Sequence, residues 1–151
     1  MRAMATIYLL NGGTTIVDDE DYWWAKEFGW AENKVTGYVC RRGPDGKTVY
    51  LHRMIMEPCE PFYVDHRNGD KKDNRSRNLR LCTPSENAWN RRKGKWTGTK
   101  WESANRKWRA VIRHGGKSKY LGIFGRREDA KAAYEAAARL LRGEFHRQET
   151  F

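Results

Sequence analysis

Short runs in which apolar and polar residues alternate dominate the first third of the chain. Two such runs, Thr6–Leu10 and Thr14–Val17, flank an Asn-Gly-Gly sequence that is typical of a hairpin turn. Two more, Gly37–Arg42 and Lys47–Leu51, flank a Gly-Pro-Asp-Gly turn. The acidic stretch 18–21 precedes an aromatic run and predicts the start of a helix, because carboxylates stabilise helix N-termini. The pattern therefore predicts two hairpins and one helix in this part of the chain.

The pattern of residues 61–95 predicts a strand, a polar loop, a second strand and a helix. Phe62–Val64 is a short apolar run, and Asn78–Cys82 alternates with the period of two expected of a half-buried strand. A Thr-Pro-Ser-Glu sequence follows, which is a capping box with proline at the first helical position, so we expect a helix to begin there. This order can bring Asn87, one turn into the helix, back over the end of the first strand.

Residues 96–151 follow a β-β-β-α pattern. Lys107–Arg113 alternates, Lys119–Phe124 reads as the next strand, and Glu128–Arg142 reads as a helix ended by Gly143. The residues expected on the buried face of the alternating strand are Trp108, Ala110 and Ile112. The apolar stripe of the helix consists of Ala130, Ala133, Tyr134, Ala137 and Leu141. Small residues in this stripe would let the helix dock closely on a sheet.

Together these patterns predict an α+β protein with three parts. They are an N-terminal α+β buttress (1–60), the strand-loop-strand-helix segment (61–95) and a three-stranded antiparallel sheet packed on one helix (96–151). Charged residues make up 32% of the chain and its mean hydropathy is −0.96, which argues against one large core. We expect several small apolar clusters, strengthened by the 13% of aromatic residues.

Positive charge is concentrated in the second and third parts. Residues 1–60 hold 7 Lys and Arg against 9 Asp and Glu, a net charge of −2. Residues 61–151 carry a net charge of +13, which gives +11 for the whole chain. Such a surface favours a polyphosphate partner, because each phosphate that is neutralised releases counterions. Charge alone fits a solvated basic surface equally well. An anionic membrane is a poorer fit, because the basic part lacks an amphipathic anchor helix.

The cysteines and apolar stretches indicate a protein of a reducing compartment. Cys40, Cys59 and Cys82 are odd in number and widely spaced, without the paired spacing of a structural zinc site or a disulfide framework. No stretch approaches the ~20 apolar residues of a membrane span, and no signal peptide opens the sequence. We therefore expect a cytoplasmic protein with reduced thiols, no structural zinc and no membrane contact.

One stretch carries a specific resemblance. The sequence VDHRNGDKKDNRSRNLRLCTPSENAWNRR resembles the ββα-metal motif of HNH endonucleases, especially the phage and mobile-intron branch. The Asp-His pair, the Asn-Leu-Arg step and the helical asparagine all occur in the family's order. Asparagine instead of histidine at the last position, and aspartate before the base, are variants of that branch. They weaken inference from relatives that use nickel or zinc.

The resemblance implies a role for four residues. His66 would be the general base, a task suited to an imidazole with an ordinary pKa of ~6.5. Asp65 and Asn87 would be metal ligands, and their oxygen donors favour one Mg²⁺ or Mn²⁺ ion over zinc. Asn78 corresponds to the central asparagine of the motif, which would hold the loop so that the base points correctly.

Nearby residues have both functional and structural interpretations. His52 and Arg53 lie just upstream and are candidate auxiliary residues, although a structural role for His52 is the stronger alternative. Arg80, Arg91 and Arg92 are candidate DNA contacts, and a solvated basic face explains them almost as well. The residues expected to be solvated are His114 and His146.

The last part of the chain carries a second resemblance. GTKWESANRKWRAVIRHGGKSKYLGIFGRREDAKAAYEAAARLLRG is similar to the APETALA/ethylene-response-factor DNA-binding domain, in which a three-stranded sheet enters the major groove. The residues that would face DNA are Lys100, Arg109, Arg113 and Tyr120. Thr97 and Val111 replace an arginine and a glutamate of that family, so its sequence preference is not expected to transfer. Solvation of the exposed sheet face is the alternative role for these arginines.

These inferences predict a metal-dependent endonuclease that acts on double-stranded DNA. The single Asp-His-Asn set favours a monomer that nicks one strand, of the phage or mobile-element (homing endonuclease) type. One alternative is a DNA-binding regulator with an inactive nuclease motif, which the intact set of three residues disfavours. Another is an RNA-directed nuclease, which the narrow major groove of A-form RNA disfavours, because that groove would not admit a sheet.

Overall fold

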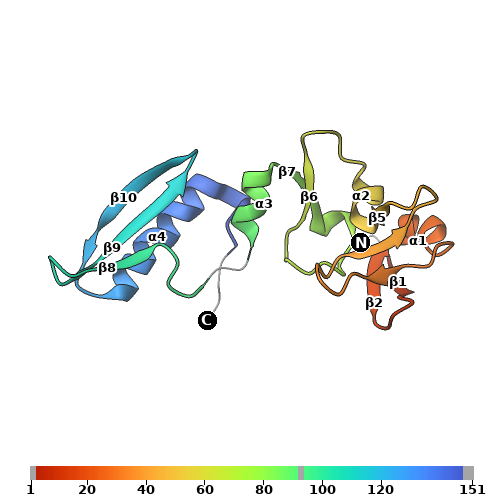
Figure 1. The fold of residues 1–151 in the computed structure, drawn as a ribbon, viewed down its shortest axis with the longest axis horizontal. Coiled ribbons are helices and arrows are strands. Elements are labelled where there is room, and N and C mark those ends of the chain that lie inside the picture. The colour runs from red at the N-terminus through yellow and green to blue at the C-terminus, as the bar shows by residue number, and fades with distance from the viewer. Residues whose placement is uncertain (1–2, 92–93, 148–151) are drawn as a thin grey trace. The chain divides into compact units, whose positions relative to one another are not determined.

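A computed structural model describes residues 3–91 and 94–147 of the chain. The chain divides into two compact units, unit 1 ending at Ala88 and unit 2 beginning at Trp89. Each unit combines helices with antiparallel strands, so the fold is α+β as predicted (Figure 1). The regions 1–60 and 61–88, treated as separate parts in the sequence, lie in the same unit.

The N-terminal region of unit 1 is built from two antiparallel sheets and two helices. Its elements are β1 (Met4–Tyr8), β2 (Thr14–Asp18), α1 (Asp19–Ala25), β3 (Ala31–Glu32), β4 (Val39–Arg42), β5 (Thr48–Tyr50) and α2 (Leu51–Met56). β1 pairs with β2, and β4 pairs with both β3 and β5. The two hairpins predicted from the turn sequences are confirmed, and so is the helix after the acidic stretch.

A small apolar core holds this region together. Its buried members are Ile7, Leu9, Val17, Ala25, Trp30, Val39 and Leu51. Trp30 is fully buried, and its indole Nε1 donates a hydrogen bond of 2.8 Å to the carbonyl oxygen of Ala25. The indole thus fills the core without leaving its polar group unpaired.

The second region of unit 1 follows the predicted order of strand, loop, strand and helix. β6 (Tyr63–His66) pairs with β7 (Leu79–Cys82), a short 3₁₀ turn η1 (Ser76–Asn78) precedes β7, and α3 (Pro84–Asn90) follows it. The capping box is confirmed, because the Thr83 backbone N–H donates to Glu86 Oε2 at 2.7 Å and the Glu86 N–H donates to Thr83 Oγ1 at 3.3 Å.

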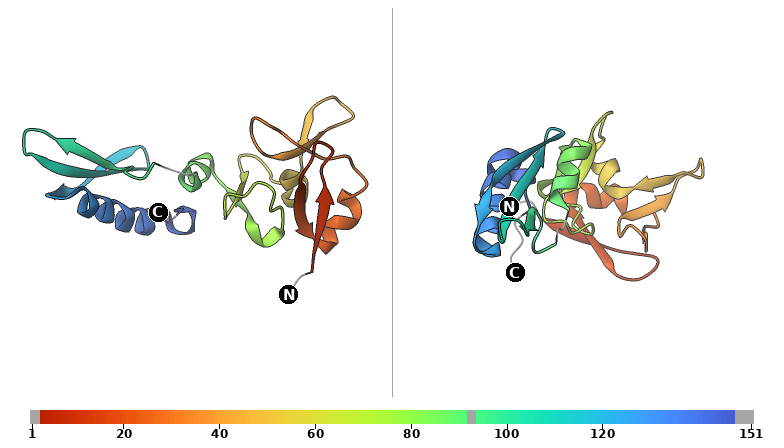
Figure 2. Two further views of the ribbon diagram at one scale, coloured as in Figure 1. Left: turned by 90° about the horizontal axis from the view of Figure 1, so that it is seen from below. Right: turned by 60° about the vertical axis from the view of Figure 1, so that its left-hand side comes forward.

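Unit 2 is a three-stranded antiparallel sheet with one long helix on one face (Figure 2). Its elements are β8 (Thr99–Glu102), β9 (Lys107–His114), β10 (Lys117–Phe124), α4 (Arg127–Arg142) and the 3₁₀ turn η2 (Gly143–Phe145). The central strand β9 presents Ala110 and Ile112 to the helix, and both are fully buried. Ala130 and Tyr134 of the predicted stripe are buried, and so is Ala138, which the predicted stripe did not include.

Gly98 shows why this packing needs glycine at one position. Its φ is +81°, and a Cβ there would overlap the ring of Tyr134. The Gly98 carbonyl also accepts a hydrogen bond of 2.9 Å from the Val111 N–H. A side chain at residue 98 would therefore push the helix away from the sheet.

Two histidines expected to be solvated are packed instead. His146 is buried, and its Nε2 lies 2.6 Å from Glu135 Oε2, while Lys131 Nζ lies 2.7 Å from Glu135 Oε1. The half-buried ring of His114 stacks on Trp89, with a centroid distance of 5.1 Å. The expectation was wrong because both partners are distant in sequence and no local pattern marks them.

Two further findings concern the thiols and the helices. Cys40, Cys59 and Cys82 are free thiols, and burial raises the pKa of Cys82 to about 11. No helix among the described residues has the length and apolar character needed to cross a membrane.

Candidate active site

The end of β6 delivers two ionisable side chains into the interior of unit 1. Asp65 is 6% exposed and His66 is 3% exposed. Because successive residues of a strand point to opposite faces, the two side chains enter different surroundings. Asp65 contacts the buried guanidinium of Arg80, whereas His66 contacts the amide of Asn74 and a cluster of aromatic rings.

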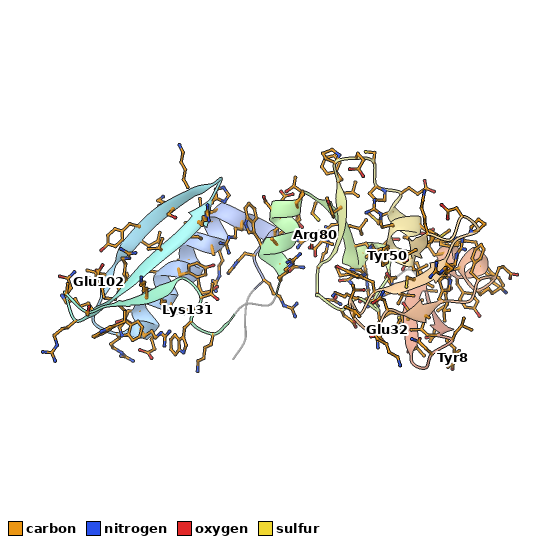
Figure 3. All side chains as sticks on the ribbon, in the orientation of Figure 1. Tyr8, Glu32, Tyr50, Arg80, Glu102 and Lys131 are labelled. Carbon is orange, nitrogen blue, oxygen red and sulfur yellow. The ribbon has the colours of Figure 1, made fainter. Side chains whose placement is uncertain are left out.

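Asp65 forms a buried ion pair with its cross-strand neighbour Arg80. Arg80, labelled in Figure 3, donates from Nε at 2.9 Å and from Nη2 at 2.7 Å to Asp65 Oδ2. The side chains are only 5% and 7% exposed. The sequence suggested Arg80 as a DNA contact, and the structure places it inside unit 1 against Asp65. The cause is the strand register, which sets the two residues directly opposite each other.

His66 is held as a neutral imidazole. Its Nε2 lies 3.2 Å from Oδ1 of Asn74, which is fully buried. Burial lowers the pKa of His66 below its ordinary value. The bond to Asn74 and the negative charges of Asp65, Asp70 and Asp73 offset that shift only in part. A neutral imidazole near pH 7 is the form that can accept a proton.

The loop between β6 and β7 is tied together by Asn78. Its Nδ2 donates to the carbonyl of Asp73 at 2.7 Å, and its Oδ1 accepts from the Asn68 N–H at 3.1 Å. The carbonyl of Asn78 accepts from the Arg67 N–H at 2.8 Å. Arg75 Nη2 pairs with Asp73 Oδ2 at 2.6 Å. These bonds are the ones expected of a residue that holds the loop beside the candidate base.

Strand β2, far away in sequence, contacts the same loop. Thr15 Oγ1 donates to the carbonyl of Lys72 at 2.7 Å, and the Ile16 N–H donates to the same carbonyl at 2.9 Å. Asp18 Oδ2 accepts from the Ser76 N–H at 2.8 Å. Sequence reasoning missed these contacts. The one available signal was a threonine near the start of a predicted strand, which is too common to single out Thr15.

His52 lies beside His66 within an aromatic cluster. The two imidazole centroids are 5.2 Å apart with the rings edge to face, and Tyr38 lies 4.8 Å from His52 and 5.9 Å from His66. Burial, helped by the electrostatic coupling to His66 and by the positive charges of Arg53 and Lys71, lowers the pKa of His52 to about 3. The structure thus brings the suggested auxiliary histidine to the candidate base, and adds Tyr38, which sequence reasoning missed.

A cavity of about 190 Å³ opens beside this cluster. Its lining residues are Thr36, Tyr38, Tyr50, His52, Arg53, Tyr63, Val64 and Asn87. Half-buried Asn87 comes from α3 and Val64 from β6, so the two elements line the same cavity. The lining does not include Asp65 or His66 at the end of β6. Within the described residues, Arg53 and Asn87 share this cavity with the aromatic cluster.

The two suggested donors, Asp65 and Asn87, would offer oxygen atoms of the kind that a hard ion prefers. Within residues 3–91 and 94–147, no three His, Cys, Asp or Glu side chains are grouped as around a metal ion. One carboxylate (Asp65) and one amide (Asn87) leave most ligand positions to water and phosphate oxygens, as in many magnesium sites. The bond from Arg80 to Asp65 reduces the negative charge available to the ion.

In unit 2 the four residues suggested as DNA contacts lie on β8, β9 and β10. Lys100 pairs with Arg109 across two strands, so both point away from α4, as do Arg113 and Tyr120. Tyr120 is 59% exposed and Arg113 is exposed, while half-buried Arg109 lies 3.6 Å from Glu102 (labelled in Figure 3). Of the other two suggested arginines, Arg91 is exposed and Arg92 lies outside the described residues.

Comparison with known proteins bears on unit 1. A family model described as HNH endonuclease matches residues 49–89, which include His52, the Asp65–His66 pair and Asn87. Searches of curated proteins and of solved structures return no significant match. The match supports an HNH nuclease domain and, with it, a nuclease-type function on phosphodiester bonds. It ends before the sheet of unit 2.

Proposed function

We propose that this chain is a metal-dependent DNA endonuclease that cuts one phosphodiester bond with His66 as general base. The observation that carries the proposal is the buried Asp65–His66 pair, in which the imidazole is kept neutral at the end of β6. A neutral, immobilised imidazole next to an oxygen ligand is what activation of a water for attack on phosphorus requires.

The chemistry assigns one task to each side chain. His66 takes a proton from a water molecule, the water oxygen forms a bond to phosphorus, and the bond from phosphorus to the leaving oxygen breaks. Asp65 and Asn87 would hold a Mg²⁺ or Mn²⁺ ion, which supplies charge stabilisation at the phosphate when bound. Arg53, which lines the cavity, would contact a phosphate oxygen.

Unit 2 would provide most of the DNA affinity. Its outward sheet face carries Lys100, Arg109, Arg113 and Tyr120, and a sheet can enter the major groove of B-form DNA. This assignment rests on the resemblance to the APETALA/ethylene-response-factor domain and on the facing of these side chains. The combination of nuclease and binding domain suits a phage or mobile-element enzyme that works as a monomer.

The plasmid assay tests the proposed function directly. With Mg²⁺ or Mn²⁺, supercoiled plasmid at limiting enzyme should become open circles well before linear DNA forms, because one Asp65–His66–Asn87 set faces one strand. A chelator should abolish the reaction. Absence of cleavage with either ion would refute nuclease activity. Linear product formed directly, at a rate that rises with the square of enzyme concentration, would show a cleaving dimer instead.

Substitutions on the sheet face test the DNA-binding role of unit 2. Arg109→Ala and Arg113→Ala should each cost about 1–3 kcal/mol of binding free energy if the arginine contacts a base, measured by titration against a cognate duplex. If it contacts a phosphate, the loss should be similar for all sequences, and the salt dependence should fall by about one counterion. Arg139→Ala is the matched control, because this exposed arginine lies on α4. Equal effects of all three substitutions would contradict the assignment.

A further inference from the structure

Asn74 connects the candidate base to strand β2 through two consecutive hydrogen bonds, and a third links the Thr15 hydroxyl of β2 to the loop backbone. Asn74 is 0% exposed, Thr15 is 1% exposed and His66 is 3% exposed. Asn74 Oδ1 lies 3.2 Å from His66 Nε2, and Asn74 Nδ2 donates to Thr15 Oγ1 at 2.8 Å. Thr15 Oγ1 in turn donates to the carbonyl of Lys72 at 2.7 Å. The chain therefore runs from a backbone carbonyl to the imidazole.

The direction of these bonds is fixed at the threonine end. A hydroxyl has one hydrogen, and that of Thr15 is directed to the Lys72 carbonyl, so its oxygen can only accept from Asn74. The second hydrogen of the Asn74 amide reaches the carbonyl of Lys71 at 3.3 Å. Both partners require Nδ2 on this side, which leaves Oδ1 facing His66. An amide oxygen only accepts, so His66 Nε2 must be the donor.

We infer that Asn74 and Thr15 are positioning residues that fix His66 in the tautomer with hydrogen on Nε2, so that Nδ1 carries the lone pair. The part of this inference that concerns catalysis rests on the proposed function, with Nδ1 as the atom that takes the proton from water. The part that concerns the tautomer stands independently. Asn74 would affect catalysis by orienting the imidazole of His66.

The inference also gives residues 1–60 a role in the site. β2 contributes the Thr15 hydroxyl, and its Ile16 carbonyl accepts from the Asn74 N–H at 2.8 Å. Ile16 and Asp73 form a parallel bridge at the same point. The backbone of β2 thus holds the backbone of Asn74 while the Thr15 hydroxyl orients its amide.

The ¹⁵N NMR spectrum of the full chain, recorded at mildly alkaline pH, tests the tautomer without any need for activity. The wild-type His66 ring should show a protonated Nε2 and an unprotonated Nδ1. Asn74→Asp keeps an acceptor oxygen facing His66 and should keep this pattern, although it removes the amide hydrogens donated to Thr15 and to the Lys71 carbonyl. Asn74→Leu removes the acceptor and should give a mixture of tautomers or the opposite one. A wild-type ring protonated on Nδ1 would overturn the inference even if no variant folds.

The DNA cleavage rates of the same variants provide a second test of the inference. Asn74→Leu should lose at least about 10-fold in rate, as typical for a partner that orients a functional histidine, and Asn74→Asp should recover much of it. Thr15→Val should lose less than Asn74→Leu, because the Lys71 carbonyl still holds the amide. Thr14→Val is the matched control, since Thr14 is the exposed neighbour of Thr15 on β2 and pairs with Tyr8 of β1.

The NMR spectrum and the cleavage rates together distinguish failure of the proposed function from failure of the positioning role. Wild-type protein that shows the expected tautomer but cleaves no DNA would refute the proposed function and leave the positioning of His66 intact. Active protein whose rate and His66 spectrum are both unchanged by Asn74→Leu would refute the positioning role and leave the nuclease intact. Thermal unfolding of each variant shows whether a lost rate reflects lost folding.

Discussion

Replacing His66 with alanine should lower the rate of DNA cleavage by at least about 10²-fold, the usual contribution of a general base. The expected loss follows from the neutral state of His66 and from its burial at the end of β6. DNA binding should be retained, because the basic sheet face belongs to unit 2. Single-turnover cleavage of a labelled duplex and a gel-shift titration measure the two properties separately.

His114→Ala is the matched control for this substitution. His114 is likewise a histidine whose ring contacts an aromatic side chain, but it is half-buried and lies in unit 2 on Trp89. Its removal should leave the rate within a few-fold of wild type. If His66→Ala cleaves at the wild-type rate, His66 is not the base, and His52 becomes the next residue to test because its ring lies 5.2 Å away.

Replacing Arg80 with alanine should destabilise the protein by about 3–5 kcal/mol, the usual cost of leaving one member of a buried ion pair without its partner. Asp65, whose side chain is 7% exposed in the wild type, would lose the two bonds from Arg80. Urea denaturation of wild type and variant gives the change in the free energy of unfolding.

Arg126→Ala removes an arginine from an exposed ion pair and serves as the control. Arg126 Nε lies 3.7 Å from Glu128 Oε2, with side chains that are 75% and 59% exposed. Exposed pairs contribute about 0–1 kcal/mol, so this variant should unfold almost like wild type. Equal destabilisation by the two substitutions would show that the Asp65–Arg80 pair adds nothing beyond a surface contact.

The pair also explains why the structure changes the interpretation of Arg80. In the sequence, Arg80 stands among basic residues and next to a motif for phosphodiester chemistry, so a DNA contact was a reasonable hypothesis. Its side-chain partner depends on the register of β6 and β7, which sets Arg80 opposite Asp65. One residue of register shift would turn Arg80 toward the other face of the hairpin.

His52 and Tyr38 are a second case in which the sequence alone did not predict a contact at the candidate site. The sequence marked His52 only as an auxiliary candidate and gave no reason to connect Tyr38 with the motif. The rings meet because the backbone between β3 and β4 and the start of α2 converge on β6. This contact depends on the packing of the whole unit, so the spacing of residues along the sequence does not predict it.

What the sequence determined by itself was local. Alternation specified the strands, the capping box began α3, and the order of elements brought Asn87 of α3 to the same cavity as Val64 of β6, because each depends on residues a few positions apart. What only the tertiary structure decided was the partner of each buried polar group. Thr15 and Asn74 are separated by 59 positions, yet they share a hydrogen bond that orients the candidate base. A buried donor must find an acceptor wherever the fold supplies one, so its partner follows from the packed chain rather than from its sequence neighbours.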